Sequence, residues 1–141
     1  MKLNRMADYA VRAVICIAQK GGNITTTALI AEEQGIPPSF LAKVMQNLNR
    51  GGIVKVHRGK SGGFSLAHDA NDITVKTIVE AVEGPIVLNR CLDRPSDCNR
   101  DSFCGAHGIW IEAQKALTSV LDKYNVAELA EKEKERMPRT S

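Results

Sequence analysis

Long apolar runs are absent from this sequence, and aromatic side chains are scarce. No segment approaches the ~18 consecutive apolar residues of a membrane-spanning helix. The apolar stretch near the N-terminus is interrupted by Asp8 and Arg12, unlike the uniform apolar region of a secretory signal peptide. We therefore expect a cytoplasmic protein without membrane contact. Because aromatic residues make up only 4% of the chain, the core should consist of Val, Ile, Leu and Ala.

Recognisable catalytic patterns are also missing. The chain has no Ser-His-Asp arrangement and no paired carboxylates of the kind used in acid–base catalysis. Gly59, Lys60 and Ser61 resemble part of a phosphate-binding loop, but no glycine stands five residues before Gly59. We predict one domain that is not an enzyme, and its 141 residues are enough for a core without disulfides.

Four segments in the first two thirds of the chain repeat apolar residues at helical spacing. Each has a capping residue or a proline near its start, or a glycine just after its end. These predicted helices are residues 6–20, the segment between the threonines at 25–27 and Gly35, residues 38–50, and the segment between Asp72 or Thr74 and Gly84.

Between the third and fourth helices the apolar period changes to two. Ile53, Val54 and Val56, followed by Phe64 and Leu66, predict two strands around a glycine-rich turn. A short helix, a tight turn, a second helix and a hairpin make a winged helix-turn-helix. We therefore predict a mainly α fold, with a two-stranded β wing and a long C-terminal dimerisation helix.

The third helix and the hairpin carry side chains suited to DNA. The polar face of the helix offers groups that hydrogen-bond base edges or phosphates, and the tip of the hairpin is basic and rich in glycine. A solvated helix face is an equally ordinary reading of the helix alone, but the basic wing favours DNA binding. The predicted DNA-binding residues are Ser39, Lys43, Gln46, Asn47, Arg50, His57, Arg58 and Lys60.

Three of the four cysteines lie in one polar segment. Cys91, Cys98 and Cys104 are separated by six and then five residues, and His107 follows three positions after the last. Clustered thiols in a chain without an export signal are typical of metal or redox chemistry. Three thiolates and an imidazole suit either an iron–sulfur cluster or zinc, although the segment lacks the close cysteine pair of most zinc sites. Cys16 lies in an apolar helix and is predicted to be a core residue.

Several motifs resemble those of the Rrf-two family of bacterial winged-helix transcription regulators, of the IscR and NsrR type. The resemblance covers nearly the whole chain and rests on "MADYAVRAV", "VHRGKSGGFSLA", "IVEAVEGPIVLNRC", the three cysteines and the helix after them. It implies a homodimer with an iron–sulfur cluster, of the 2Fe–2S or 4Fe–4S type, near the dimer interface. It also implies DNA contacts by Ser39 and Arg58.

The resemblance implies that Cys91, Cys98 and Cys104 are the thiolate ligands. IscR-like members use a histidine that matches His107 as the fourth ligand, whereas NsrR-like members use an aspartate of the other subunit that matches Asp8. Asp8 and Arg12 also have the spacing of an ion pair within one helix. The six-residue first spacing differs from the five of the IscR type. Ala42 replaces the carboxylate that some IscR-like members carry there.

A long helix after the cysteines has one apolar face that could pair with its twin in a two-fold interface. The predicted interface residues are Ile109, Trp110, Ala113, Leu117, Val120, Leu121 and Tyr124. The chain would then consist of a DNA-binding domain (1–84), a cluster-binding loop (85–106), the dimerisation helix (107–126) and a charged tail (127–141), whose residues 130–141 we expect to be frayed.

These patterns favour a homodimeric repressor that binds a palindromic DNA operator and whose affinity depends on an iron–sulfur cluster. The cluster would report on redox state, nitric oxide or iron–sulfur supply. One alternative is a winged-helix regulator with a zinc site or a cysteine thiol switch. Another, of a different class, is a small iron–sulfur electron carrier, which would need the cluster but not the basic wing.

Overall fold

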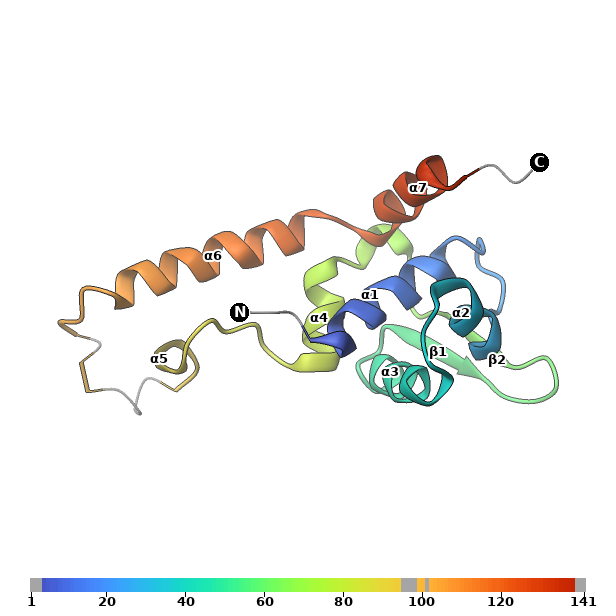
Figure 1. Cartoon of the computed structure of the whole chain (residues 1–141), viewed down its shortest axis with the longest axis horizontal. Helices are drawn as coiled ribbons and strands as arrows, with labels where there is room; N and C mark the ends of the chain where they lie inside the picture. The colour runs from blue at the N-terminus through green and yellow to red at the C-terminus, as the bar shows by residue number, and fades with distance from the viewer. Residues whose placement is uncertain (1–3, 95–98, 101, 139–141) are drawn as a thin grey trace.

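The computed structural model describes residues 4–94, 99–100 and 102–138. It is mainly helical with one two-stranded antiparallel sheet, and the predicted fold class is confirmed (Figure 1). The elements are α1 (Arg5–Ala18), α2 (Thr27–Gln34), α3 (Pro38–Arg50), β1 (Val54–His57), β2 (Gly63–Leu66), a 3₁₀ turn η1 (Ala70–Asp72), α4 (Val75–Glu83), α5 (Arg90–Asp93), α6 (His107–Lys123) and α7 (Val126–Arg136).

Local signals in the sequence set most of the helix ends. The side chain of Thr26 accepts a hydrogen bond from the backbone N–H of Leu29, and Thr74 caps α4 in the same way through Thr77. Gly35 ends α2 with φ of 62°, a left-handed conformation that glycine adopts without strain. The predicted helix boundaries in this half of the chain are therefore confirmed to within a few residues.

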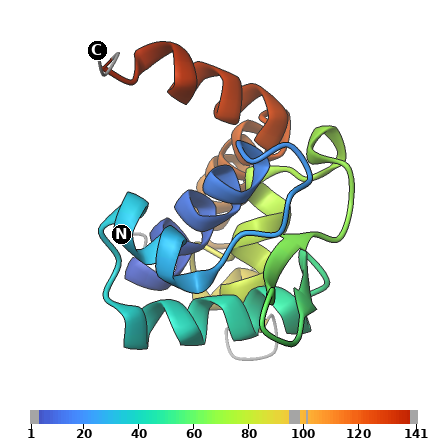
Figure 2. The same cartoon turned by 90° about the vertical axis from the view of Figure 1, so that its right-hand side faces the viewer.

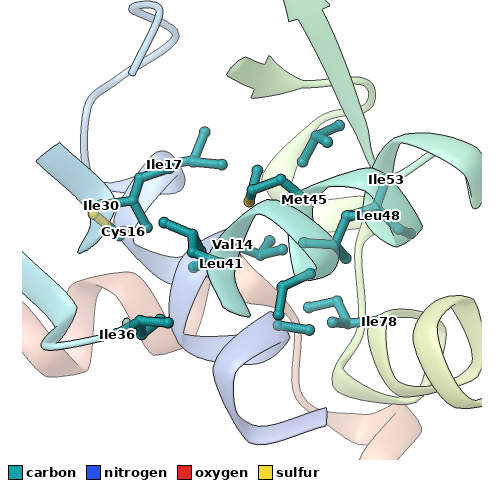
Figure 3. Packing of buried hydrophobic residues seen from close by; sticks show 14 of the residues in the cluster. Val14, Cys16, Ile17, Ile30, Ile36, Leu41, Met45, Leu48, Ile53 and Ile78 are labelled. Atoms are coloured by element: carbon teal, nitrogen blue, oxygen red, sulfur yellow. The ribbon is translucent and has the colours of Figure 1, made fainter. Parts of the chain in front are cut away.

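Helix α1 runs through the middle of the domain, and its apolar side faces α2, α3 and α4. Figure 3 shows the resulting core, in which Val14 and Ile17 of α1 lie among side chains of the neighbouring elements. The labelled partners are Ile30, Ile36, Leu41, Met45, Leu48, Ile53 and Ile78. Cys16 is fully buried, as predicted. Aliphatic residues dominate this core, because the chain has few aromatic residues to contribute.

The wing is fixed to the domain by more than its own turn. Val54 pairs with Leu66 at its base, and His57 pairs with Gly63 near its tip. The N–H and C=O groups of Thr25 both bond to Phe64, at 2.8 Å each, so the segment before α2 extends the sheet. A Cβ atom on Gly63 would come within 2.5 Å of the Thr25 carbonyl oxygen, so only glycine allows this approach.

Helix α6 leaves the domain, and Figure 1 shows its first residues beside α5 at the end of the molecule remote from α2 and the wing. Its second half packs on α4. It ends at Lys123, before the expected limit at residue 126, because the next residues pair with the segment before α4: Val126 N–H donates to Ile73 C=O at 2.8 Å. In the described residues no helix is long and apolar enough to cross a bilayer.

The expectation of a frayed C-terminal tail is wrong for residues 130–136, which belong to α7 (Val126–Arg136). Asn125 caps this helix, and Val126 and Ala130 are buried against α1. These two apolar residues are one helical turn apart, so they form an apolar side that anchors an otherwise charged helix. Figure 2 shows α7 and α3 on opposite sides of α1.

Candidate nucleic-acid interface and cysteine-rich loop

The outer face of α3 is largely polar because its large aliphatic residues turn inward. Leu41, Val44, Met45 and Leu48 are buried, which leaves the opposite face to solvent. Four of the predicted DNA-binding residues are exposed on this helix, namely Ser39, Lys43, Gln46 and Arg50. Asn47 is half-buried, and its amide nitrogen lies 3.8 Å from the sulfur of Met6. It is therefore less available to a ligand than the other four.

The wing presents Arg58 and Lys60 as exposed side chains at its tip. His57 is half-buried, and its Nε2 lies 2.7 Å from the hydroxyl oxygen of Ser65 on the opposite strand. This pair fixes the imidazole along the hairpin. A Cβ atom on Gly62 would lie 2.4 Å from the His57 carbonyl oxygen, so the tight turn also depends on glycine.

Two grooves place the wing beside the helices. A groove of about 390 Å³ between α3 and the wing is lined partly by Lys43, Gln46 and Arg58. A second groove, of about 520 Å³, lies between the wing and the start of α2, where Thr26 and Thr27 line it. Sequence reasoning considered these threonines only as helix caps and missed their position beside Arg58. The free N–H groups at the start of α2 would have been the signal, since they attract phosphates.

This surface is basic because carboxylates are missing from the segment that forms it. From residue 34 to residue 68 the chain contains no Asp or Glu, and it contains Lys43, Arg50, Lys55, Arg58 and Lys60. The segment that forms α3 and the wing thus carries five positive charges and no negative ones, whereas the whole chain has a net charge of +3. A face of this kind attracts a polyanion over the distance of a Debye length, about 10 Å at 0.1 M salt.

The cysteine-rich loop lies at the other end of the molecule. Cys91 is in α5, Cys104 precedes α6, and His107 is the first residue of α6. Cys91 and Cys104 are half-buried free thiols, and α5 packs against α6. Cys98 lies outside the described residues. Among the residues that are described, no three His, Cys, Asp or Glu side chains are gathered as a metal site.

His107 has an unusual environment for an imidazole. Its Nδ1 atom is buried and has no hydrogen-bond partner among the described residues. A buried ring nitrogen without a partner costs free energy unless another group forms a hydrogen bond or a metal–ligand bond with it. Ala106, at the start of α6, provides no side-chain cap, so the positive end of this helix also faces the loop. Both features fit thiolates and a metal, because thiolates are anionic and imidazole nitrogen is a metal ligand.

Asp8 is not part of this group within one chain. It lies exposed in the first turn of α1, an element that packs on α2, α3, α4 and α7. Its carboxylate is 3.5 Å from the guanidinium of Arg12, so the ion pair considered from the sequence is present. Arg12 also donates to the backbone carbonyl of Gln34 at the end of α2, and its guanidinium carbon lies 5.2 Å from the centre of the Tyr9 ring.

The predicted interface residues of α6 occupy two sides of the helix. Leu117 and Leu121 are half-buried and face a groove shared with α1 and α4, and Ala113 and Tyr124 are also half-buried. In contrast, Ile109 is 60% exposed and Val120 is 54% exposed. Trp110 lies near the free end of α6 and is 40% exposed.

The fourth cysteine is remote from the loop and has its own partners. The Cys16 thiol donates to a carboxylate oxygen of Glu33 at 3.2 Å, and Lys20 is 2.7 Å from the other oxygen. Burial, helped by the neighbouring carboxylate, raises the pKa of Cys16 to about 11. At neutral pH this thiol is therefore protonated and a poor nucleophile.

Comparison with known proteins gives one consistent result. The family model Rrf2, described as iron-dependent transcriptional regulator, matches residues 3–132. The regulator NsrR of Bacillus subtilis is 32% identical over 139 residues, which is 97% of this chain and 95% of that protein. The B. subtilis global cysteine regulator CymR has a similar structure, with a TM-score of 0.75, 28% identity, and 93% and 97% of the two chains covered. The structure of T. potens IscR has a TM-score of 0.75 and 26% sequence identity, with 99% of this chain and 94% of that chain covered.

Proposed function

Because the chain belongs to the Rrf2 family of transcriptional regulators, we propose that it is a homodimeric repressor. Its affinity for DNA would depend on an iron–sulfur cluster bound in the Cys91–Cys104 loop. Family membership confirms the resemblance noted in the sequence and the prediction that the protein is not an enzyme. The carboxylate-free basic face of α3 and the wing is the observation that carries the DNA-binding part of the proposal.

In this proposal α3 is the recognition helix and enters the major groove. Ser39, Lys43 and Gln46 face the bases, because they are exposed along one side of the helix. Arg58 and Lys60 reach the neighbouring backbone or minor groove from the wing. The start of α2, at Thr26 and Thr27, receives a phosphate in the groove beside Arg58.

The exposed side of α6 supplies the dimer contact. Ile109, Ala113, Ala116 and Val120 follow one another at intervals of three or four residues, so they form one stripe along the helix. The large members of the stripe are exposed in the single chain, and a second copy would cover them in an isologous interface. Two recognition helices related by a two-fold axis then match a palindromic operator.

Cys91, Cys98 and Cys104 are the proposed thiolate ligands, and the fourth is His107 or Asp8 of the partner subunit. When bound, an iron–sulfur cluster would connect its ligand residues through metal–ligand bonds, which oxidation or nitric oxide can break. The chain's own part is to hold α5 against the start of α6 and to offer the unpartnered Nδ1 of His107.

The route from the loop to DNA follows from the contacts of Asp8. This carboxylate pairs with Arg12 within the chain, and Arg12 bonds the end of α2 just before the recognition helix. If Asp8 serves the partner's cluster, the pair with Arg12 is weakened, so the position of α2 responds to cluster state. A coupling of roughly 1–3 kcal/mol would change operator affinity by about 5–150-fold.

The test is anaerobic purification, followed by selection of an operator from a random duplex pool and titration at fixed salt. We expect a brown protein with iron and sulfide, and an operator affinity that differs between cluster-loaded and cluster-free forms. Colourless protein with stoichiometric zinc would support the zinc alternative instead. Equal affinity of the two forms would exclude a cluster-dependent switch.

A further inference from the structure

The segment that carries Cys91 is joined to α6 by a hydrogen bond to Gln114, a residue to which no role has been assigned so far. The backbone N–H of Leu88 donates to the side-chain oxygen of Gln114 at 2.9 Å, and the contact is partly buried. Within the described residues, no other hydrogen bond joins α6 to residues 84–94. Leu88 is three positions before Cys91, so this bond anchors the chain shortly before the first thiol of the loop.

Gln114 and His107 lie on the same side of α6. They are seven positions apart, close to two full helical turns, so their side chains point in nearly the same direction about 10 Å apart along the axis. Both are half-buried, whereas Ile109 and Val120, on another side of the helix, are exposed. One face of α6 therefore holds the imidazole at its start and the anchor for the Cys91 segment two turns later.

Besides this bond, the Cys91 segment contacts α6 through apolar side chains at residues 85–87 and through α5, and neither contact fixes its register along the helix as a hydrogen bond does. Residues 85–89 form no helix or strand, and α5 is only four residues long. A helix of one turn is not stable by its own hydrogen bonds. The position of Cys91 relative to Cys104 and His107 thus depends in large part on where residue 88 is held.

The same bond is not needed to attach α6 to the rest of the domain. Leu117 and Leu121 already face Val79 of α4 and the turn at Gly84 across a groove. The second half of α6 packs on α4 over this apolar contact. Loss of the Gln114 side-chain oxygen should therefore leave the fold intact and release mainly the loop.

We propose that Gln114 is a positioning residue for the iron–sulfur site, which holds Cys91 at the correct distance from Cys104 and His107 through the Leu88 N–H. The inference rests on the proposed function. It predicts a defect in cluster retention without a matching defect in folding.

Two variants separate the hydrogen bond from the size of the side chain. Gln114→Met keeps the length and removes the oxygen, whereas Gln114→Glu keeps an acceptor at the same place. Lys115→Ala, at an exposed position of the same helix, is the matched control. Each protein is purified anaerobically, and its iron, sulfide and visible spectrum are measured with the rate of bleaching in air. Hydrogen exchange of the Leu88 amide is measured by NMR on the reduced, metal-free proteins.

For Gln114→Met we expect a thermal midpoint close to that of the parent, fivefold to tenfold less protection of the Leu88 amide, and bleaching faster by about the same factor. Gln114→Glu and Lys115→Ala should behave like the parent. The proposal is overturned if Gln114→Met bleaches at the parent rate, or if Gln114→Glu protects Leu88 yet bleaches as fast as Gln114→Met. Parent protein without iron and sulfide would refute the proposed function itself, and with it the role of Gln114.

Discussion

Gly51 and Ala81 approach so closely that a side chain at position 51 has no room. A Cβ atom on Gly51 would lie 2.7 Å from the Cβ of Ala81 and 3.3 Å from the carbonyl oxygen of Asn47. Gly51 follows the last residue of α3, and Ala81 lies in α4. This contact sets the spacing between α3 and α4, the helix that leads to the cysteine-rich loop.

Gly51→Ala should therefore destabilise the protein. Neither the Ala81 methyl group nor the backbone of α3 can move aside freely, and overpacking of this kind costs about 1–3 kcal/mol. Urea unfolding measures the loss. Gly108→Ala is the control, because nothing lies within 4 Å of its added Cβ. In a helix that change is expected to raise the free energy of unfolding by up to about 1 kcal/mol. Identical unfolding curves for the two variants would refute the claim.

Arg58→Ala should weaken DNA binding without affecting the cysteine-rich loop. One fewer phosphate contact lowers the slope of log affinity against log salt by about 0.9. Fluorescence anisotropy on a random duplex at several salt concentrations gives this slope. Lys132→Ala removes a charge from α7, on the side away from α3, and should leave the slope unchanged. An electron carrier that does not use the wing would show no difference between these variants.

Val120→Glu should shift the protein from dimer to monomer. The substitution places a charge in the exposed stripe of α6, where a second copy would bury it without a partner. Sedimentation at several protein concentrations is the measurement, and we expect at least a tenfold weaker dimer. Lys115→Glu changes the charge on another exposed side of α6 and serves as control. A dimer that tolerates Val120→Glu must use another surface.

Asp8→Asn and His107→Ala identify the fourth ligand. Because the Asp8–Arg12 pair is largely exposed, Asp8→Asn should lower the free energy of unfolding by less than about 1 kcal/mol. Only the variant that removes a true ligand should lose iron and sulfide on anaerobic purification. If both variants retain the parent spectrum, neither side chain is a ligand.

Cys16→Ala should change the response of stability to alkaline pH. In the folded protein the pKa of the Cys16 thiol is raised from 9.0 to about 11, chiefly by burial. The folded state therefore binds the thiol proton more tightly than the unfolded chain does. The resulting stabilisation is complete below pH 9 and is lost as the pH rises through about 11. Urea unfolding from pH 7 to 11 should show a steeper decline for the parent, by up to about 2 kcal/mol, than for Cys16→Ala. Parallel declines would contradict the buried, protonated thiol.

Local signals explain why much of the fold could be predicted from the sequence. Thr26, Gly35 and Gly52 mark helix ends through a side-chain cap and left-handed backbone, which act within a few residues. The wing is equally local, because its glycines and its alternating apolar residues lie in one short segment. The exposed positions on α3 follow from the burial of its apolar stripe.

Other features depend on contacts between distant segments and could not be predicted. Arg12 bonds the carbonyl of Gln34, a group that every residue carries and that no motif marks. The two sides of α6 look alike in sequence, and only the position of α4 separates Leu117 from Val120. The apolar spacing of α7 was hidden among charged residues. The ligand role of the cysteines, His107 and Asp8 stays a prediction.

The docking of α7 on α1 has a consequence for synthesis in the cell. Gln19, the residue that follows α1, donates to Glu133 of α7, a partner that the ribosome adds 114 residues later. Val126 and Ala130 cover the same helix from the last described element of the chain. The DNA-binding half therefore cannot finish burying its central helix until residues 126–136 have left the ribosome.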